Sequence, residues 1–511
     1  MEMQLHFFSI NAFFLLLLVL FFLVKQLKIQ KSSGNAQKLP PRPNKLPFIG
    51  NLHQLLGSLP HQSLKKLADK YGPLMHLQLG ELSTIIVSSP KLAKEVLQTN
   101  SLAFANRPQL LVAKIIQYNN LGVSFCPYGD YWRQMRQIYI MELLSAKSVQ
   151  SFFSIMEDEL SYLVGSIEAE EGRPFTLNQK IVSYLNKTIF RATVGRVCKD
   201  QGALILAAKE VSSLAGIFNI ADLFPSLKIL QLVSGLKPKL DKLWRKLDVI
   251  LDDIVNDHEK SMIDKQGGNS AMEEEDVVDV LLKLKEINDF QFPVTKDSIK
   301  AIIFELSVAG TATSSVLVEW AMSEMLKNPR IMAKAQSEVR QAFKAKKRIC
   351  GDDIQGLKYL KWVIKETLRL HPPGPLLAPR ECREECTISG YNIPINTVTI
   401  VNAWAIGRDP EYWNDPEKFN PERFSDKAID FRGNNFELIP FGAGKRMCPG
   451  ISYGVTNVEL VLANLLYHFD WKLPQGINPQ DLDMTEVFGA SAGRKNNLYL
   501  DAKIYIPSND H

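Results

Sequence analysis

The sequence is poor in cysteine: its 511 residues include only six, at irregular spacings, and Cys382 and Cys386 have no second ligand pair beside them. In a chain of this length such spacing argues against a disulfide framework, and the missing second pair argues against structural zinc. The sequence also lacks internal repeats and any Gly/Ser-rich or Pro-rich linker in its middle. These absences favour one large domain with reduced thiols.

Acidic residues are absent between Glu2 and Asp69, although the whole chain has a net charge of only +5. With 46% hydrophobic and 23% charged residues, the composition is typical of a globular protein. The basic excess is too weak and too scattered to indicate a nucleic-acid partner. The basic residues that precede Asp69 and follow the first apolar run include Lys25, Lys28, Lys31, Lys38, Arg42 and Lys45.

The first apolar run extends from about Leu5 to Val24 and has no polar side chain from Ala12 onward. About 20 apolar residues in a helix cross a bilayer. A cleaved signal peptide is the alternative, but the start is not basic and no A-x-A-like site precedes Lys25. We therefore expect residues 1–25 to form a single-pass N-terminal transmembrane helix, with the basic residues and the rest of the chain in the cytosol.

Residues 26–51 form a basic, proline-rich segment between this anchor and the body of the protein. Clustered prolines resist helix, so we expect a stiff hinge that holds the body at a set angle over the membrane surface. The interleaved apolar residues Leu46, Phe48 and Ile49 should pack against the body.

The remaining residues, 52–511, show mainly helical periodicity and form the expected catalytic domain. A long pattern at 295–326 predicts a helix of about 45–50 Å, enough to cross the whole domain. Residues 265–276 are expected to be a solvated, mobile loop. Further helices are expected at 61–70, 90–98, 130–144, 149–168 and 236–257, and short strands at 74–79, 83–87, 387–388 and 398–401. The fold class is therefore mainly α with a minor β region.

The segment at 441–450, with the sequence FGAGKRMCPG, surrounds Cys448 with glycines and basic residues. A cysteine that binds haem iron must be a thiolate, which needs hydrogen-bond donors, positive charge and a close approach of the backbone. Gly444 and Gly450 permit that approach, and Arg446 offers a cation for a haem propionate. A helix predicted over 451–466 would direct its N-terminus at the sulfur.

This string resembles the cysteine-ligand loop of the cytochrome P-450 family position by position, from Phe441 through Arg446 to Cys448. A purely structural cysteine is the alternative, and the full F-x-x-G-x-R-x-C-x-G pattern speaks against it. The resemblance implies the fold of that family, in which a long central helix lies over a haem. It also implies that the cofactor is haem b and that Cys448 is the axial ligand of its iron.

Three further motifs agree with this resemblance and occur in the family's order along the chain. By resemblance, the haem propionates are contacted by Trp132, Arg136 and Arg380. Glu366 and Arg369 lie at i and i+3 of one predicted helix, where they can pair. The resemblance implies that Arg423 completes this pair as a structural lock behind the haem loop.

Residues 309–314, with the sequence AGTATS, resemble the family segment that crosses the oxygen pocket in mid-helix. In the family a glycine loosens the helix there and an acid–threonine pair relays protons to iron-bound dioxygen, which implies catalytic roles for Gly310 and Thr313. Ala312 stands where the acid is usual. Either this departure is neutral, with water and the Thr313 hydroxyl carrying protons, or it slows proton delivery. Slow delivery would favour coupling, desaturation or aromatisation over oxygen insertion.

By resemblance the substrate pocket draws on mostly apolar segments, which favours a small hydrophobic substrate. The segments are 104–124, 217–223, 304–309, 376–378 and 487–490. Expected pocket members include Phe304, Glu305, Ala309, Leu377 and Phe488. As the one nearby acid, Glu305 either faces a substrate amine or turns away from the pocket.

The narrower resemblance is to plant members of the family, carried by the hinge and by the segments 436–441 and 453–457. Those members oxidise monoterpene indole alkaloids or terpenoids, and some close rings oxidatively instead of hydroxylating. This favours an indole alkaloid as substrate, with a terpenoid next.

The sequence has no flavin or nicotinamide fingerprint, so electrons must come from another protein. The resemblance implies NADPH–cytochrome P-450 reductase in the endoplasmic reticulum membrane, and the basic residues that flank the haem sulfur and suit its acidic face are Arg133, Arg136, Lys445 and Arg446. The implied function is an NADPH- and O2-dependent oxidase. A reductase-independent haem-thiolate isomerase or dehydratase is the alternative, favoured by Ala312 and opposed by Thr313. A non-catalytic haem-binding protein is a third hypothesis, which the complete motif set opposes.

Overall fold

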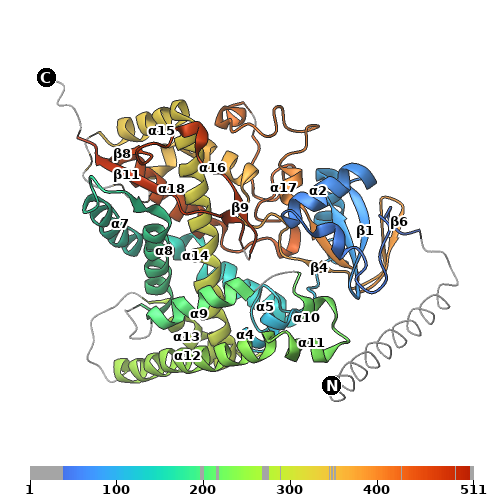
Figure 1. Cartoon of the computed structure of the whole chain (residues 1–511). Helices are drawn as coiled ribbons and strands as arrows, with labels where there is room; N and C mark the ends of the chain where they lie inside the picture. Colours follow the sequence, from blue (N-terminus) through green and yellow to red (C-terminus); the bar gives the residue numbers. More distant parts are fainter. Residues whose placement is uncertain are drawn as a thin grey trace, which may run out of the picture.

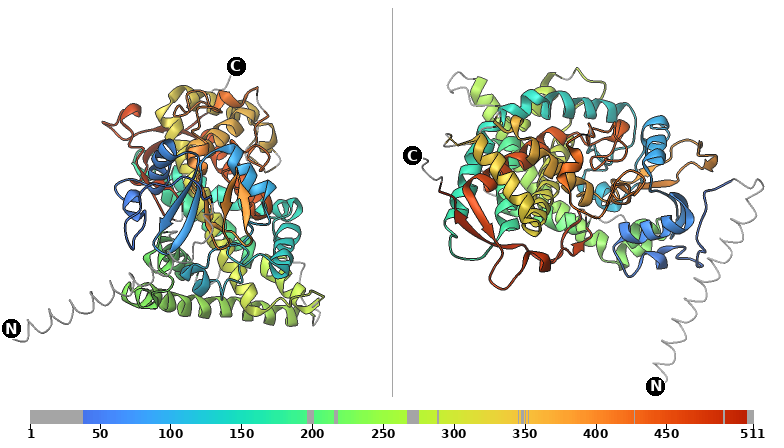
Figure 2. Two further views of the ribbon diagram at one scale, coloured as in Figure 1. Left: turned by 90° about the vertical axis from the view of Figure 1, so that its right-hand side faces the viewer. Right: turned by 90° about the horizontal axis from the view of Figure 1, so that it is seen from above.

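The computed structural model describes residues 38–195, 201–214, 218–266, 275–287, 289–344, 346, 349, 351, 353–426, 428–489 and 491–506. The expected anchor at 1–25, the first part of the hinge and most of the expected loop at 265–276 lie outside these residues. Figure 1 shows a helix-rich body beside a smaller strand region, and Figure 2 shows the same division from the strand side and from above. A mainly α fold with a minor β region is confirmed.

The body is organised around α14 (Lys296–Lys327), the long central helix of Figure 1. A capping box between Thr295 and Ser298 starts this helix, and it ends at Lys327 with Asn328 as its C-cap, just before Pro329. The predicted helix at 295–326 is therefore confirmed. The most apolar window of α14 is long and apolar enough to cross a membrane, but 56% of it is buried inside the protein. It is the core helix of the domain.

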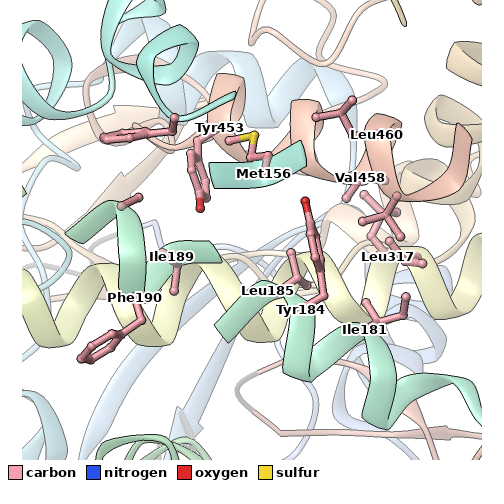
Figure 3. Packing of buried hydrophobic residues seen from close by; sticks show 14 of the residues in the cluster. Met156, Ile181, Tyr184, Leu185, Ile189, Phe190, Leu317, Tyr453, Val458 and Leu460 are labelled. Carbon is pink, nitrogen blue, oxygen red and sulfur yellow. The ribbon is translucent and has the colours of Figure 1, made fainter. Parts of the chain in front are cut away.

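The helices that pack on α14 include α8 (Leu177–Val194), α16 (Lys358–Leu370) and α18 (Ile451–His468). Figure 3 shows Tyr184 and Leu185 of α8 close to Leu317 of α14 and Val458 of α18. The Tyr184 hydroxyl donates to Asn457 Oδ1 at 3.0 Å, which satisfies the one polar group that this ring carries into the core.

The other helices of the body cover this core. They are α4 (Leu111–Ile116), α5 (Asp130–Ile138), α6 (Ala146–Ser151), α7 (Phe153–Glu168), α9 (Gln201–Leu214), α10 (Ile220–Leu223), α11 (Lys228–Val233), α12 (Leu236–Gln266), α13 (Val277–Ile287) and α15 (Pro329–Ala342). The single helix predicted over 149–168 is divided at Phe152, and the one predicted over 130–144 continues as a π-helical turn, η3 (Tyr139–Leu143). Likewise, the helix predicted over 90–98 is α3 (Pro90–Lys94) followed by the π-helical turn η2 (Glu95–Thr99).

The strand region is a four-stranded sheet in the order β1-β2-β7-β4. β1 (Leu74–Leu79) and β2 (Leu82–Val87) form an antiparallel hairpin, β7 (Val398–Val401) runs parallel to β2, and β4 (Arg380–Glu381) runs antiparallel to β7. Helices α2 (Pro60–Tyr71) and α17 (Ala403–Ile406) contact each other beside it. This sheet fixes β4 and therefore the position of Arg380.

Three smaller sheets complete the described part of the chain. They are β5 (Cys386–Ile388) with β6 (Tyr391–Ile393), β9 (Glu486–Val487) with β10 (Gly493–Arg494), and β11 (Tyr499–Ile504) between β3 (Phe175–Thr176) and β8 (Phe469–Lys472). Phe488 and Gly489, which follow β9, line the cavity described below.

The described part of the hinge is tied to the body by its backbone and by Asn51. The Asn51 side chain donates to the carbonyl of Asn44 at 3.2 Å and accepts from the amide of Gln78 at 2.9 Å. Leu46 and Ile49, in contrast, are 46% and 39% exposed. The prediction that these two residues pack against the body is therefore wrong, because polar contacts already hold the segment in place.

Candidate active site

A cavity of about 550 Å³ lies between the middle of α14, the loop before α5, the segment at 373–380 and the segment at 440–450. Most of its lining is apolar, including Val112, Ile116, Phe304, Leu377 and Phe488. A cavity of this size and character suits a medium-sized hydrophobic ligand. The segments predicted for the substrate pocket therefore meet around one space.

Cys448 lines this cavity, and its side chain is open to it. The loop that presents Cys448 closes with a hydrogen bond of 3.0 Å from its amide to the carbonyl of Phe441, which also lines the cavity. Gly444 adopts a positive φ of 67°, and a Cβ there would lie 1.8 Å from the carbonyl oxygen of Leu97. Only glycine fits that close approach.

The pKa of the Cys448 thiol reflects two opposing influences. Burial raises the pKa, whereas the amide of Gly450 and the charge of Arg136 lower it, and burial dominates. A positive centre bound at this sulfur, such as a metal ion, would lower the pKa and favour the thiolate. The donor set at this position suits a thiolate ligand that forms on metal binding.

Four arginines surround the same cavity: Arg107, Arg136, Arg380 and Arg446. None of them forms an ion pair with a carboxylate of the described residues. Burial lowers the pKa of Arg380 to about 9 and that of Arg446 to about 10, with neighbouring arginines adding to the effect. Both side chains stay charged at pH 7, so the cavity contains concentrated positive charge that suits a dianionic ligand.

Arg107 was missed by the sequence reasoning, although it lies within the predicted pocket segment 104–124. Its guanidinium donates to the carbonyl of Ser124 at 2.9 Å and to those of Ala378 and Pro379, each at 2.7 Å. It therefore ties the loop before α5 to the segment that leads into β4. The only local signal is a basic residue between Asn106 and Pro108, which no pattern distinguishes.

Arg446 and Trp132 form one unit at the edge of the cavity. The guanidinium of Arg446 lies 4.5 Å from the centre of the Trp132 ring and donates to three backbone carbonyls, including that of Val123 at 3.1 Å. The Trp132 indole nitrogen donates to the same Val123 oxygen at 3.1 Å. The indole donor expected to face a propionate therefore binds the backbone of the loop instead.

Arg380 is placed by β4 and donates to the carbonyl of Ala443 at 2.9 Å, which links the sheet to the cysteine loop. The Arg136 side chain makes no hydrogen bond with the residues that the structure describes, although burial lowers its pKa. Arg136 is thus the cavity arginine whose donors are all available to a ligand.

Glu305 lines the cavity, but its carboxylate is committed to the protein. Oε2 accepts from the amide of Val123 at 2.9 Å and from the Tyr139 hydroxyl at 2.6 Å, and Oε1 accepts from the amide of Ser124 at 2.8 Å. The hypothesis that Glu305 faces a substrate amine does not fit this arrangement, because three donors of the protein already occupy both oxygens. Its carboxylate holds the loop before α5 against α14.

The middle of α14 forms the roof of the cavity with Ala309, Gly310 and Thr313. Thr313 Oγ1 donates to the carbonyl of Ala309 at 2.8 Å, so its lone pairs remain available on the cavity side. Ala312 does not line the cavity. Gly310 belongs to a continuous helix, and a Cβ there would lie 2.2 Å from Ile189 Cδ1 of α8. In this structure Gly310 allows the close contact of two helices.

The three residues expected to form the structural lock, Glu366, Arg369 and Arg423, lie together at the end of α16. The Arg369 guanidinium donates to both oxygens of Glu366, at 2.8 Å each, and Arg423 donates to the same carboxylate at 2.9 Å. The side chains of Glu366 and Arg369 are completely buried. A buried bidentate pair of this kind fixes the end of α16 against the chain at 407–423.

Asp222 of α10, the one further acid among the described residues that lines the cavity, was also missed. Burial raises its pKa to about 6, although a hydrogen bond of 2.8 Å from the amide of Leu111 opposes that rise. Ile217, the first residue of the predicted pocket segment at 217–223, lies outside the described residues.

The chain is similar to proteins of one known family. The family model for cytochrome P-450 matches residues 40–499. Solved structures of a zebra fish cytochrome P-450 with progesterone and with abiraterone superpose with TM-scores of 0.75 and 0.73, at 22% and 23% identity. They cover 87% and 88% of this chain and 100% of each solved chain. At these identities the two structures show the fold.

Relatives of higher identity extend over nearly the whole chain. Alstonine synthase of Alstonia scholaris is 59% identical over 98% of this chain and 98% of the relative. Premnaspirodiene oxygenase of Hyoscyamus muticus is 52% identical over 99% of this chain and 100% of the relative. Sarpagan bridge enzyme 1 of Rauvolfia serpentina is 52% identical over 98% of this chain and 99% of the relative.

Proposed function

The chain belongs to the cytochrome P-450 family, and on that premise we propose that it oxidises a small hydrophobic molecule of plant specialised metabolism, an indole alkaloid first and a terpenoid next. The family match and the named relatives make it an oxidoreductase of the monooxygenase type. The names of two relatives, alstonine synthase and sarpagan bridge enzyme, support an alkaloid, and that of premnaspirodiene oxygenase supports a terpenoid. We further propose that Ala312 and Thr313 decide whether the enzyme inserts oxygen into the substrate or only removes hydrogens from it.

One observation carries this proposal: the Cys448 thiol opens into the same apolar cavity as Thr313, between arginines that have no carboxylate partners. This donor set fits haem b. Cys448 Sγ would bind the iron, and the cavity arginines would hold the propionates. When bound, the haem supplies the iron centre at which O2 is reduced and the substrate is oxidised.

The residues of this chain supply shape, charge and protons. The apolar lining excludes water and holds a hydrophobic substrate against the roof formed by Ala309 and Thr313. Thr313 Oγ1 can accept a hydrogen bond from water on the cavity side because its own proton is donated to Ala309. Glu305 and Asp222 are the only acids that line the cavity among the described residues, and both accept backbone hydrogen bonds.

Proton delivery at the roof therefore rests on Thr313 and water, without an adjacent acid. We propose that this arrangement favours oxidative C–C coupling, desaturation or aromatisation over plain hydroxylation. A reductase-independent isomerase or dehydratase is the second candidate function, and the same missing acid supports it. The two differ in their need for NADPH and a reductase.

We propose NADPH–cytochrome P-450 reductase as the electron donor and the endoplasmic reticulum membrane as the location, with residues 1–25 as anchor and residues 26–51 as hinge. Lys445 is exposed beside the cysteine loop, and Arg133 of α5 is exposed although it pairs with Asp130. We propose that these two exposed basic side chains contribute to the surface that binds an acidic partner.

The test uses microsomes that contain the full chain together with a plant reductase. They receive a panel of indole alkaloids and terpenoids with and without NADPH, and product masses are read. A product that has lost two hydrogens relative to the substrate supports coupling, desaturation or aromatisation, and a product that has gained one oxygen supports hydroxylation. Turnover of a peroxide without NADPH would instead support the reductase-independent isomerase or dehydratase.

A further inference from the structure

Cys382 and Cys386 lie in contact at the edge of the strand region. Their Sγ atoms are 4.0 Å apart, and both thiols are free. Cys382, just after β4, is completely buried, whereas Cys386 at the start of β5 is partly exposed. Nothing in the proposed oxidation uses either thiol.

The backbone on both sides holds the two thiols in place. The Cys382 amide donates to the carbonyl of Thr397 at 2.9 Å, and the Cys382 carbonyl accepts from the amide of Asn396 at 2.7 Å. Cys386 pairs with Ile393 in the β5–β6 ladder. Only three residues separate two fixed positions, so the pair is a preformed feature of this loop.

We propose that Cys382 and Cys386 form a dithiol modification site that hydrogen peroxide oxidises to an intramolecular disulfide. This inference does not depend on the proposed substrate or reaction. A disulfide needs an S–S distance of about 2.05 Å, so the sulfurs must approach by roughly 2 Å, which side-chain rotation within a short loop can supply. Dithiols of this kind in cytosolic proteins form transient, redox-responsive disulfides.

The reaction balances in two steps. The Cys386 thiolate, which is the accessible sulfur, attacks one oxygen of the peroxide, so an S–O bond forms, the O–O bond breaks and hydroxide leaves. The Cys382 thiolate then attacks the Cys386 sulfur, so the S–S bond forms, the S–O bond breaks and a second hydroxide leaves. Two thiols and one hydrogen peroxide give one disulfide and two water molecules.

Accessibility assigns the two roles, because Cys386 is partly exposed whereas Cys382 is completely buried. The hydrogen bond between the two sulfurs lowers the pKa of Cys382, which suits Cys382 as the thiolate that closes the disulfide. The same interaction raises the pKa of Cys386, and the neighbouring acids Glu384 and Glu95 add to the rise. Because a thiolate is the attacking species in each step, the disulfide should form faster at pH 8 than at pH 7.

The site is coupled to the cavity through β4. Arg380, two residues before Cys382, lines the cavity and donates to Ala443. Between them, Glu381 donates its amide to the carbonyl of Asn106 at 3.0 Å. Oxidation that pulls Cys382 toward Cys386 would therefore be transmitted to a residue of the haem site.

The sequence supplies a direct test because Arg383 lies between the two cysteines. Trypsin cleaves after Arg380, Arg383 and Arg408, which places Cys382 in the peptide 381–383 and Cys386 in the peptide 384–408. The full chain in detergent is treated with hydrogen peroxide, alkylated while denatured and digested without reductant. Mass spectrometry then measures the two peptides joined by a disulfide and separated again by a reductant.

We expect the joined peptides in the wild-type chain, formed faster at pH 8 than at pH 7, and their loss in Cys386→Ser. Cys126 is the matched control thiol, because it is buried and donates to the carbonyl of Pro127, with no second thiol beside it among the described residues. It should remain alkylated in full. Overoxidised Cys386 with reduced Cys382, or two unmodified peptides at a peroxide dose that oxidises free glutathione, would each overturn the proposal.

Discussion

The Tyr139 hydroxyl donates a hydrogen bond of 2.6 Å to Glu305 Oε2, and both side chains are buried. This contact joins the π-helical turn after α5 to the middle of α14. The same carboxylate receives the amides of Val123 and Ser124, while arginines hold the carbonyl oxygens of these two residues. The peptide that borders the cavity at this point is therefore held on every polar atom by a charged side chain.

Glu305→Gln should loosen this loop, because an amide presents only one acceptor oxygen to three donors. Leaving a buried donor unpaired costs about 1–3 kcal/mol. We expect a lower melting temperature and a substrate-induced spectral shift that needs roughly tenfold more substrate, equivalent to about 1.4 kcal/mol.

Glu319→Gln is the matched control for Glu305→Gln. Glu319 is also buried on α14 and accepts from Asn178 at 2.9 Å, but it does not line the cavity. The Glu319→Gln variant should have a lower melting temperature without a change in substrate affinity. Equal effects of the two variants on substrate affinity would contradict a positioning role for Glu305.

Cys448→Ser should abolish the thiolate signature in the spectrum of the reduced, carbon-monoxide-bound protein. A hydroxyl is a far weaker anionic ligand than a thiol at the same position. Cys126→Ala is the control, since that thiol is buried outside the cavity lining and burial raises its pKa to about 12. An unchanged spectrum in Cys448→Ser would refute the assignment of the iron ligand.

Ala312→Asp should raise the share of oxygenated product if proton delivery decides the outcome, because it restores an acid beside Thr313. In Ala312→Asn the new side chain has nearly the same shape as in Ala312→Asp but no acidic proton. This variant should therefore keep the product ratio of the wild type. The ratio of oxygenated to dehydrogenated product is measured by mass. If both variants shift it equally, shape and not proton transfer is responsible, and an unchanged ratio in both makes Ala312 neutral.

The central helix could be predicted closely from sequence because its start and end depend on local chemistry. Thr295 and Ser298 form the capping box, and Pro329 stops the pattern, so the predicted range 295–326 differs little from Lys296–Lys327. Cys448 could be predicted as a ligand, and Glu366 and Arg369 as an ion pair, because each belongs to a compact string of neighbouring residues. Such features need no knowledge of the fold.

The contacts of Glu305 and Arg107 could not be predicted, because their partners are far away in sequence. Glu305 meets amides 182 and 181 residues away, and Arg107 meets carbonyls 271 and 272 residues away. The π-helical turn at Tyr139 was missed for another reason. A hydrophobic period of 3.6 continues through such a turn, so the pattern at 130–144 predicts one uninterrupted helix.

Glu366→Ala should prevent accumulation of folded protein, because it leaves the buried guanidinium of Arg369 without its carboxylate. Breaking a buried ion pair on one side costs about 3–5 kcal/mol, a large part of the stability of a typical domain. Glu422→Ala is the control: the carboxylate binds Arg330 and Lys334 at the surface, at 3.1 and 2.7 Å. Exposed pairs contribute about 0–1 kcal/mol, so this variant should yield normal amounts of folded protein.

His258 should make stability depend on pH. Its Nδ1 lies 2.7 Å from the carbonyl oxygen of Ile254, and its Nε2 lies 3.0 Å from Asp276 Oδ2 and 3.2 Å from the carbonyl oxygen of Val194. Because both ring nitrogens face acceptors, the ring fits best as a doubly protonated imidazolium. Burial lowers the pKa of His258, but the hydrogen bond and charge of Asp276 outweigh it, and the pKa lies above 6.5.

A histidine pKa that is higher in the folded than in the unfolded chain contributes stability that is fully present below the unfolded value and is lost as the pH rises through the folded value. The melting temperature should therefore fall as the pH increases above 6.5, the ordinary value of this group. Asp276→Asn removes the partner and should flatten that slope. His53→Gln, which removes a ring whose only hydrogen bond among the described residues is with the Gly50 carbonyl, should preserve it. An equal slope in the wild type and in Asp276→Asn would mean that another group titrates. His258, Asp276 and Asp279 together also have the ligand types of a metal site. A chelator should leave the slope of melting temperature against pH unchanged, because an imidazolium has no lone pair for a metal ion.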